Sequence, residues 1–140
     1  MARVLIVEDD GALRYDLSSE LSSWGHEVLV ATDGSSGFLS IRDEYPDLVL
    51  CDIVMPKASG FDLLERLKLL GSDYEDICFL FISSRDGPEM IVEGIKADKL
   101  DITKYLLKGL PKFDPNHPDS FEQFMVPASP AANAVKPLGS

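Results

Sequence analysis

Apolar and polar positions alternate along this chain in two distinct rhythms. Five short runs are almost wholly apolar, and such runs are typical of buried strands when turn residues bound them. They predict strands at residues 3–8, 27–31, 47–52, 77–83 and 104–107. The run at 77–83 is the most apolar of the five, so we expect it in the centre of a sheet.

The stretches between these runs carry apolar residues at helical spacing. Leu13, Leu17, Leu21 and Trp24 fall on one face of a first helix, and Gly25 follows where a helix commonly ends. Further helices are predicted at residues 35–45, 60–70 and 87–97, the second with Leu63, Leu64, Leu67 and Leu70 on one side.

Strands that alternate with helices are typical of βαβ units, in which helices cover both faces of a parallel sheet. The pattern therefore predicts an α/β protein with a doubly wound, five-stranded parallel sheet. In such sheets the ligand site lies beyond the carboxyl ends of the strands, where the strand order reverses.

Composition narrows the partners that this domain can have. The chain has 140 residues, enough for one domain, and a formal net charge of −11. That charge argues against direct binding of nucleic acid or of an anionic membrane, because both favour a basic face. No signal peptide is visible and no apolar run reaches the roughly 18 residues of a membrane span, so we expect no membrane association and a cytoplasmic location.

The cysteines and histidines suggest no site. Cys51 and Cys78 lie inside apolar runs and are expected to be buried core residues rather than disulfide or zinc partners. His26 and His117 have no evident partner, and we expect both on the surface.

Polar residues that suit chemistry follow the predicted strands. Glu8, Asp9 and Asp10 end the first strand, and Asp52 ends the third. The fourth and fifth strands end in Ser83-Ser84 and Lys108. Because parallel strands end at one edge of the sheet, acids, a hydroxyl group and an ammonium group should converge there. Asp10, taken alone, also fits a helix N-cap.

This set of groups suits a hard cation and phosphoryl chemistry. Several carboxylate oxygens at one small site favour Mg²⁺. A carboxylate such as Asp52 can act as a nucleophile towards phosphorus, and Mg²⁺ with Lys108 would offset the charge on the phosphoryl oxygens.

The chain resembles the receiver domains of bacterial two-component response regulators over residues 2–110. The resemblance rests on "LIVEDD", "CDIVMPKASGFDLL", "FLFIS" and "KYLLK", and the pattern Asp-x-x-Met-Pro-x-x-x-Gly is its most specific part. It implies the flavodoxin-like strand order 2-1-3-4-5. It also implies that a histidine kinase or a histidine phosphotransfer protein is the phosphodonor. The phosphorylated domain would then act on an output partner or effector domain, which the sequence does not identify.

The resemblance gives each site residue a role. Asp52 is the implied phosphoacceptor, Asp9 a direct Mg²⁺ ligand, Glu8 its partner through water, and the backbone carbonyl of Val54 the third protein ligand. The acidic pair could instead be Asp9 and Asp10. We favour Glu8 and Asp9, because residues 13–14 then fall at their usual distance into the first helix.

The remaining roles concern phosphate binding and switching. Ser83 is the implied switch hydroxyl, Lys108 the phosphate-binding lysine and Tyr105 the rotating aromatic. The protein would catalyse only its own phosphorylation and dephosphorylation, and so would not be an enzyme in the usual sense.

Three features depart from the family pattern. Gly109 stands where a proline is usual, so we expect a trans peptide bond and a less firmly held lysine. The connection before Lys108 is longer than usual, with an insertion expected at 98–102. A regular final helix is missing, because six of the nine prolines lie after residue 110 and only 119–125 has a helical pattern.

These departures suggest how the chain is organised. We expect a receiver domain at 1–110, an atypical segment with a short helix at 111–126, and a linker or disordered tail at 127–140. Because the final helix usually helps to form the symmetric receiver dimer, we do not expect that dimer here.

Two other functional classes remain open on the sequence alone. A pseudo-receiver would keep the fold and bind partners without phosphorylation. A phosphatase of the haloacid dehalogenase type also uses an aspartyl nucleophile, but it needs a second acid two residues later, where this chain has Val54. A nucleotide or flavin binder is disfavoured, because neither GxGxxG nor GxxxxGK[ST] occurs.

Overall fold

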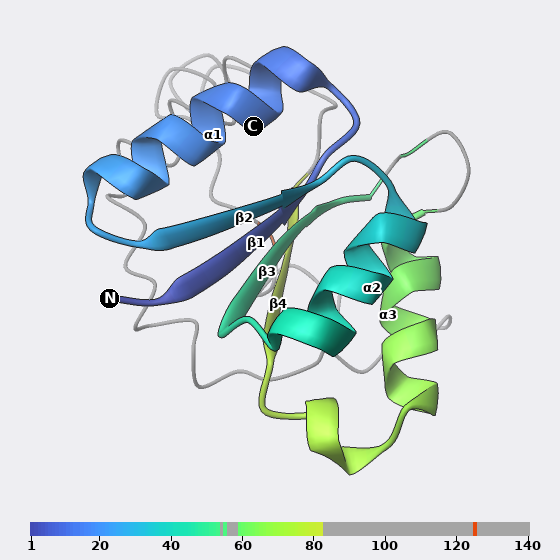
Figure 1. Cartoon of the computed structure of the whole chain (residues 1–140). Coiled ribbons are helices and arrows are strands. Elements are labelled where there is room, and N and C mark those ends of the chain that lie inside the picture. Colours follow the sequence, from blue (N-terminus) through green and yellow to red (C-terminus); the bar gives the residue numbers. More distant parts are fainter. Residues whose placement is uncertain (54, 56–58, 83–124, 126–140) are drawn as a thin grey trace, which may run out of the picture.

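The computed structural model describes residues 1–53, 55, 59–82 and 125 of the chain. Within them, four parallel strands form one sheet in the order β2-β1-β3-β4 (Figure 1). The strands are β1 (Arg3–Val7), β2 (Glu27–Ala31), β3 (Leu48–Asp52) and β4 (Cys78–Ile82). This order confirms the parallel α/β fold and the first four positions of the expected order 2-1-3-4-5. The expected strand at 104–107 and helix at 87–97 lie outside the described residues.

Helices cover both faces of this sheet (Figure 1). Helix α1 (Gly11–Ser23) packs on one face, while α2 (Gly34–Glu44) and α3 (Gly60–Leu69) lie side by side on the other. A short 3₁₀ turn, η1 (Ser72–Tyr74), connects α3 to β4. Strands β3 and β4 are completely buried, as their apolar runs predict.

Helix α1 forms where its leucine spacing predicts it. Leu13, Leu17 and Leu21 are buried against the sheet, and Trp24 packs against the core at the end of the helix. Gly25 follows with a φ of +88°, a left-handed conformation that glycine adopts without steric cost. The chain can therefore turn sharply from α1 into β2.

Helix α3 ends one residue earlier than its leucine pattern suggests. Leu63, Leu64 and Leu67 are buried, as expected. Leu70, which was expected on the same side, is instead the residue that ends the helix, and it is exposed. The helix begins with a capping box in which Ser59 and Asp62 exchange side-chain to backbone hydrogen bonds.

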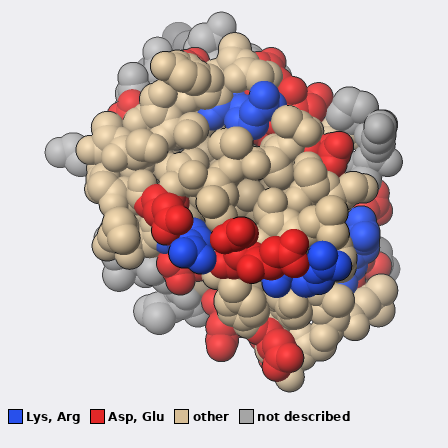
Figure 2. Space-filling view, viewed as in Figure 1, with Lys and Arg blue, Asp and Glu red and all other residues tan. Residues whose placement is uncertain are grey.

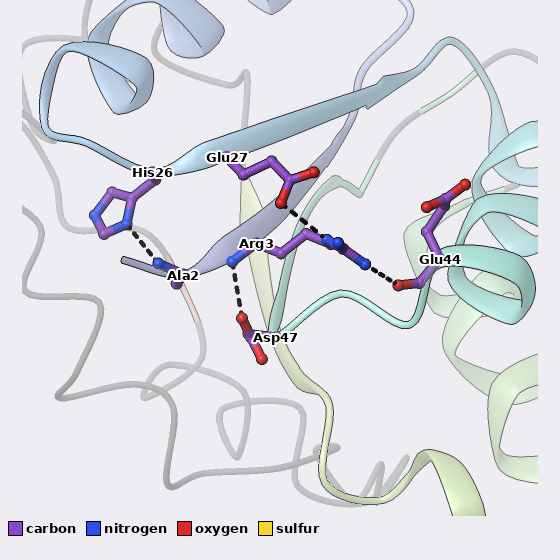
Figure 3. Close-up of polar contacts among 6 residues, drawn as sticks. All are labelled: Ala2, Arg3, His26, Glu27, Glu44 and Asp47. Atoms are coloured by element: carbon purple, nitrogen blue, oxygen red, sulfur yellow. Dashed lines mark hydrogen bonds and ion pairs between the residues drawn. The ribbon is translucent and has the colours of Figure 1, made fainter.

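A polar network at the amino end of the sheet holds the strands in register (Figure 3). The Arg3 side chain pairs with Glu27 at 3.1 Å and donates to the carbonyl of Glu44 at 2.8 Å, while the Arg3 amide donates to Asp47 at 2.8 Å. His26, for which the sequence suggested no partner, is half-buried and accepts a hydrogen bond from the Ala2 amide at 3.1 Å. This network lies at the opposite end of the strands from the predicted site.

Met125 lies beside β4, far from the rest of the described chain in sequence. It forms an isolated parallel bridge with Phe81 and packs against the core. Phe81 already pairs with Cys51 of β3, so Met125 takes its other side. Met125 is the last residue of the segment 119–125 for which a helix was expected, and at this residue the structure has a bridge instead; the rest of that segment is outside the described residues.

The two cysteines are core residues, as their positions in apolar runs predict. Cys51 and Cys78 are buried and free. On the face shown in Figure 2, the described basic side chains lie beside acidic ones rather than in a field of one sign. None of the helices in the described ranges is long and apolar enough to cross a bilayer.

Candidate metal and phosphoacceptor site

The site lies where β1 and β3 end side by side. Val7 pairs with Cys51 in the parallel ladder, so the next residues on the two strands, Glu8 and Asp52, emerge at the same level. Asp9 follows in the turn to α1. One carboxylate oxygen from each of Glu8, Asp9 and Asp52 lies within 4.8 Å of the others. The fold thus brings together three acids that the sequence assigned to one site.

Two of these carboxylates are buried. Glu8 is 1% exposed and Asp52 is 2% exposed, whereas Asp9 is exposed. A buried carboxylate is unfavourable unless hydrogen bonds or a cation compensate for the lost hydration. The three groups therefore form a cluster of acids, of which two are buried and Asp9 is in contact with solvent.

The surroundings of Glu8 fix its position but leave one oxygen bare. Its amide donates to the carbonyl of Ala31 at 3.0 Å, and its Oε1 accepts from the Asp10 amide at 3.2 Å. Its Oε2 is buried and has no hydrogen-bond partner among the described residues. A buried polar oxygen without a partner calls for an explanation, and an ion or a water molecule that binds there is one.

The same surroundings change the protonation of Glu8. Burial, followed by the negative charge of the neighbouring Asp52, raises the pKa of Glu8 from its ordinary value to about 8. In the absence of a cation, the cluster would therefore hold a proton on Glu8 at neutral pH. A divalent cation at the same place would displace that proton.

Glycine at the start of α3 allows the helix to meet the end of β3. A Cβ atom on Gly60 would lie 2.6 Å from the backbone oxygen of Asp52, closer than any side chain can approach. The Gly60 amide also donates to the carbonyl of Ile53 at 2.9 Å, and the Ile53 amide donates to Ile82 at 3.1 Å. The backbone that follows Asp52 is therefore held by β4 and by α3.

Asp10 belongs to the helix rather than to the cluster. Its side chain accepts a hydrogen bond from the Leu13 amide at 3.0 Å, which makes it the N-cap of α1. It is not among the three carboxylates that converge. The geometry thus favours Glu8 and Asp9 as the acidic pair.

Four other residues that the sequence assigned to the site lie outside the described residues: Val54, Ser83, Tyr105 and Lys108.

Two described residues near the site were not predicted from the sequence. Gly60 stands inside the recognised motif, but only the fold reveals its close approach. Arg14 donates from its guanidinium to the carbonyls of Glu8 and Asp9, at 2.8 and 3.4 Å.

The oxygens present suit a hard divalent cation. Three carboxylate oxygens lie close together, and Glu8 also has a buried oxygen without a hydrogen-bond partner. Mg²⁺ takes oxygen ligands of this type while it keeps part of its water shell. Glu8, Asp9 and Asp52 are the side chains that would hold it.

This fold and this acidic edge define a parallel α/β domain with a cation site at the carboxyl ends of its strands. Residues 4–113 match the response regulator receiver domain family, and the chain belongs to that family. Receiver domains are the phosphoacceptor modules of two-component signalling, and this is the function of the domain.

Named relatives agree with this assignment. The chain is 46% identical to the protein PilH of Pseudomonas aeruginosa over 67 residues, which cover 48% of this chain and 55% of PilH. It is 34% identical to the response regulator MprA of Mycolicibacterium vanbaalenii over 95 residues, 68% of this chain and 40% of MprA. The chain thus spans about half the length, or less, of these curated relatives.

A solved structure supports the fold. The chemotaxis response regulator CheY4 of Vibrio cholerae superimposes with a TM-score of 0.57 and 29% sequence identity, over 64% of this chain and 73% of CheY4.

Proposed function

We propose that Asp52 is the residue that accepts a phosphoryl group, in a reaction that requires Mg²⁺. The observation that carries this proposal is the convergence of Glu8, Asp9 and Asp52 at one end of the sheet, with a bare, buried oxygen on Glu8. The donor is a phosphohistidine on a histidine kinase or on a histidine phosphotransfer protein.

The chemistry follows from the carboxylate of Asp52. One of its oxygens attacks phosphorus, so that an O–P bond forms while the P–N bond of phosphohistidine breaks, and the leaving imidazole takes up a proton. Bound Mg²⁺ would supply positive charge to the phosphoryl oxygens. The backbone bonds from Ile53 to Ile82 and from Gly60 to Ile53 keep Asp52 in place during the attack.

Residues that the structure does not describe complete the proposal. The backbone carbonyl of Val54 is the third Mg²⁺ ligand, Lys108 binds the phosphoryl oxygens, and Ser83 donates to one of them. Tyr105 turns into the space that Ser83 leaves when it moves towards the phosphoryl group. In this scheme the protein catalyses its own phosphorylation and dephosphorylation and no other reaction.

The partners of the phosphorylated state are proteins. The net charge of −11 disfavours direct contact with nucleic acid. The departures after Lys108 suggest that the usual symmetric receiver dimer is replaced by a contact made by residues 111–126. The cytoplasm is the proposed place of action, because the sequence has no visible signal peptide and no apolar run long enough to span a membrane.

Mass spectrometry after incubation with acetyl phosphate and Mg²⁺ tests the proposal. The wild-type protein should gain the mass of one phosphoryl group, while Asp52→Asn and an EDTA-treated sample should gain none. Asp47→Asn is the matched control, because Asp47 lies just before the other end of the same strand and contacts the Arg3 amide. A wild-type protein that gains no mass would favour the pseudo-receiver, and labelling that persists in Asp52→Asn would exclude Asp52 as the acceptor.

A further inference from the structure

Arg14 is a basic residue near the amino end of helix α1. It is the fourth residue of α1, whose N-cap is Asp10, and its amide makes the first hydrogen bond of the helix, to the carbonyl of Asp10 at 2.9 Å. The amino end of a helix carries partial positive charge, so a cation there is electrostatically unfavourable. A basic residue at this position therefore needs an explanation from its contacts.

The Arg14 side chain folds back over the start of its own helix. A Cβ atom on Gly11 would lie 3.6 Å from Nη2 of Arg14. The Nη1 atom donates to the carbonyl of Glu8 at 2.8 Å and lies 3.4 Å from the carbonyl of Asp9. The guanidinium group thus binds the backbone of two consecutive residues that carry site carboxylates.

These contacts complete the positioning of Glu8. Its amide is held by Ala31, its Oε1 by the Asp10 amide, and its carbonyl by Arg14. With these three attachments, the peptide plane between Glu8 and Asp9 is fixed. The direction in which both side chains leave the backbone is fixed with it, so the Glu8 carboxylate is kept close to Asp9 and Asp52.

We infer that Arg14 is a positioning residue of the cation site, which acts through the backbone of Glu8 and Asp9 and touches neither the cation nor the phosphoryl group. This inference rests on the proposed function, because it concerns the affinity of the same site for Mg²⁺. Residues that hold metal ligands in place without touching the metal typically weaken metal affinity about 10- to 100-fold when they are mutated.

Calorimetric titration of the metal-free, full-length protein with MgCl₂ tests the inference. Arg14→Met removes both hydrogen bonds but keeps a long apolar stem, and it should raise the Kd for Mg²⁺ at least about tenfold. Arg14→Lys retains one charged donor without the planar fork and should fall between Arg14→Met and wild type. Arg42→Met is the matched control, because Arg42 is an exposed arginine of α2 that pairs only with its neighbour Asp43 in the described residues, and it should bind as wild type does.

A second readout separates positioning from simple loss of folding. The rate of phosphorylation by acetyl phosphate in Arg14→Met should be low at limiting Mg²⁺ and should return to the wild-type rate at saturating Mg²⁺. A variant that only destabilised the fold would instead show a lower melting temperature with an unchanged Kd.

The outcomes are distinct for the two proposals. An Arg14→Met protein that binds Mg²⁺ as wild type does would overturn the inference. If Arg14→Met does not fold, the same affinity in Arg14→Lys as in wild type would overturn it. A wild-type protein that binds no Mg²⁺ and gains no phosphoryl group would overturn the proposed function itself.

Discussion

Glu8 is a carboxyl group in a place that disfavours its charge. Its pKa is raised to about 8 by burial and by Asp52, while in the unfolded chain it lies near 4.5. Between these values the folded protein binds more protons than the unfolded chain does. Stability therefore falls as the pH rises through this window, by up to about 1.4 kcal/mol per pH unit.

This linkage predicts the behaviour of the metal-free protein. Urea unfolding in EDTA should show a free energy of unfolding that decreases between about pH 5 and pH 8, and Glu8→Gln should remove most of that decrease. Glu65→Gln changes an exposed carboxylate of α3 and should leave the pH dependence as it is. A Glu8→Gln protein with the wild-type slope would show that another group titrates.

Asp9 allows a separate test of repulsion within the cluster. Its exposed carboxylate lies within 4.8 Å of the buried Glu8 and Asp52, so it repels the charge of Asp52 and disfavours a charge on Glu8 when no cation is present. Asp9→Asn should raise the melting temperature of the metal-free protein by a few degrees and weaken Mg²⁺ binding at the same time. A lower melting temperature in EDTA would contradict this electrostatic account.

At the scale of elements, α1 and α3 both begin with glycine, but the two glycines have different surroundings. Gly60 at the start of α3 lies where a Cβ would be 2.6 Å from the Asp52 oxygen, whereas a Cβ on Gly11 at the start of α1 would meet only the Arg14 side chain, at 3.6 Å. The close contact at Gly60 is with backbone, which cannot move aside without displacing Asp52. The two glycines therefore form a matched pair for substitution.

Alanine at these two positions should have different effects on stability and on phosphorylation. Gly60→Ala should lower the free energy of unfolding by about 1–3 kcal/mol and slow phosphorylation of Asp52, since α3 or the end of β3 must shift. Gly11→Ala should be neutral or stabilise by up to about 1 kcal/mol, because alanine favours the helix. Urea unfolding and acetyl phosphate labelling of both variants measure this difference, and equal effects would show that the contact at Gly60 is unimportant.

Most of these elements could be predicted because their patterns are local. The apolar runs of β1 to β4 and the leucines of α1 determine where strands and helices occur, and parallel strands then bring Glu8 and Asp52 to one edge. Contacts that depend on the path of a side chain or on the packing of a helix have no such local pattern. The role of Arg14 depends on how its side chain folds back, and the contact of Gly60 depends on how α3 packs, so neither is visible in the sequence. The exposure of Leu70 was missed because the end of a helix varies by a residue or two.

For the molecule as a whole, the acidic site couples metal binding to stability. A ligand that binds only the folded protein stabilises it by mass action, by about 2.7 kcal/mol at a concentration 100 times its Kd. Mg²⁺ should therefore raise the melting temperature of the wild-type protein, and the increase should be smaller in Asp9→Asn. A melting temperature that does not respond to Mg²⁺ would indicate that the three acids hold no cation.

The contact of Met125 with the core makes a prediction for truncated chains. Deleting residues 127–140 keeps Met125 and should leave the melting temperature unchanged. Deleting residues 111–140 removes Met125 and its contact with Phe81, and should lower the melting temperature or change the oligomeric state. Differential scanning calorimetry with size-exclusion chromatography compares the two, and equal stability of both truncated proteins would show that the contact is dispensable.

The bridge between Phe81 and Met125 also has a consequence for how the protein is made. Phe81 and Met125 are as far apart along the chain as Val4 and Leu48, which pair across β1 and β3. On the ribosome, β4 is finished well before Met125 is added, and at about 5–20 residues per second the interval lasts roughly 2–9 s. During that time Phe81 lacks this partner on the outer side of β4. An unpaired strand edge can recruit other chains, so the nascent protein should be most prone to aggregation, and most dependent on chaperones, in this interval.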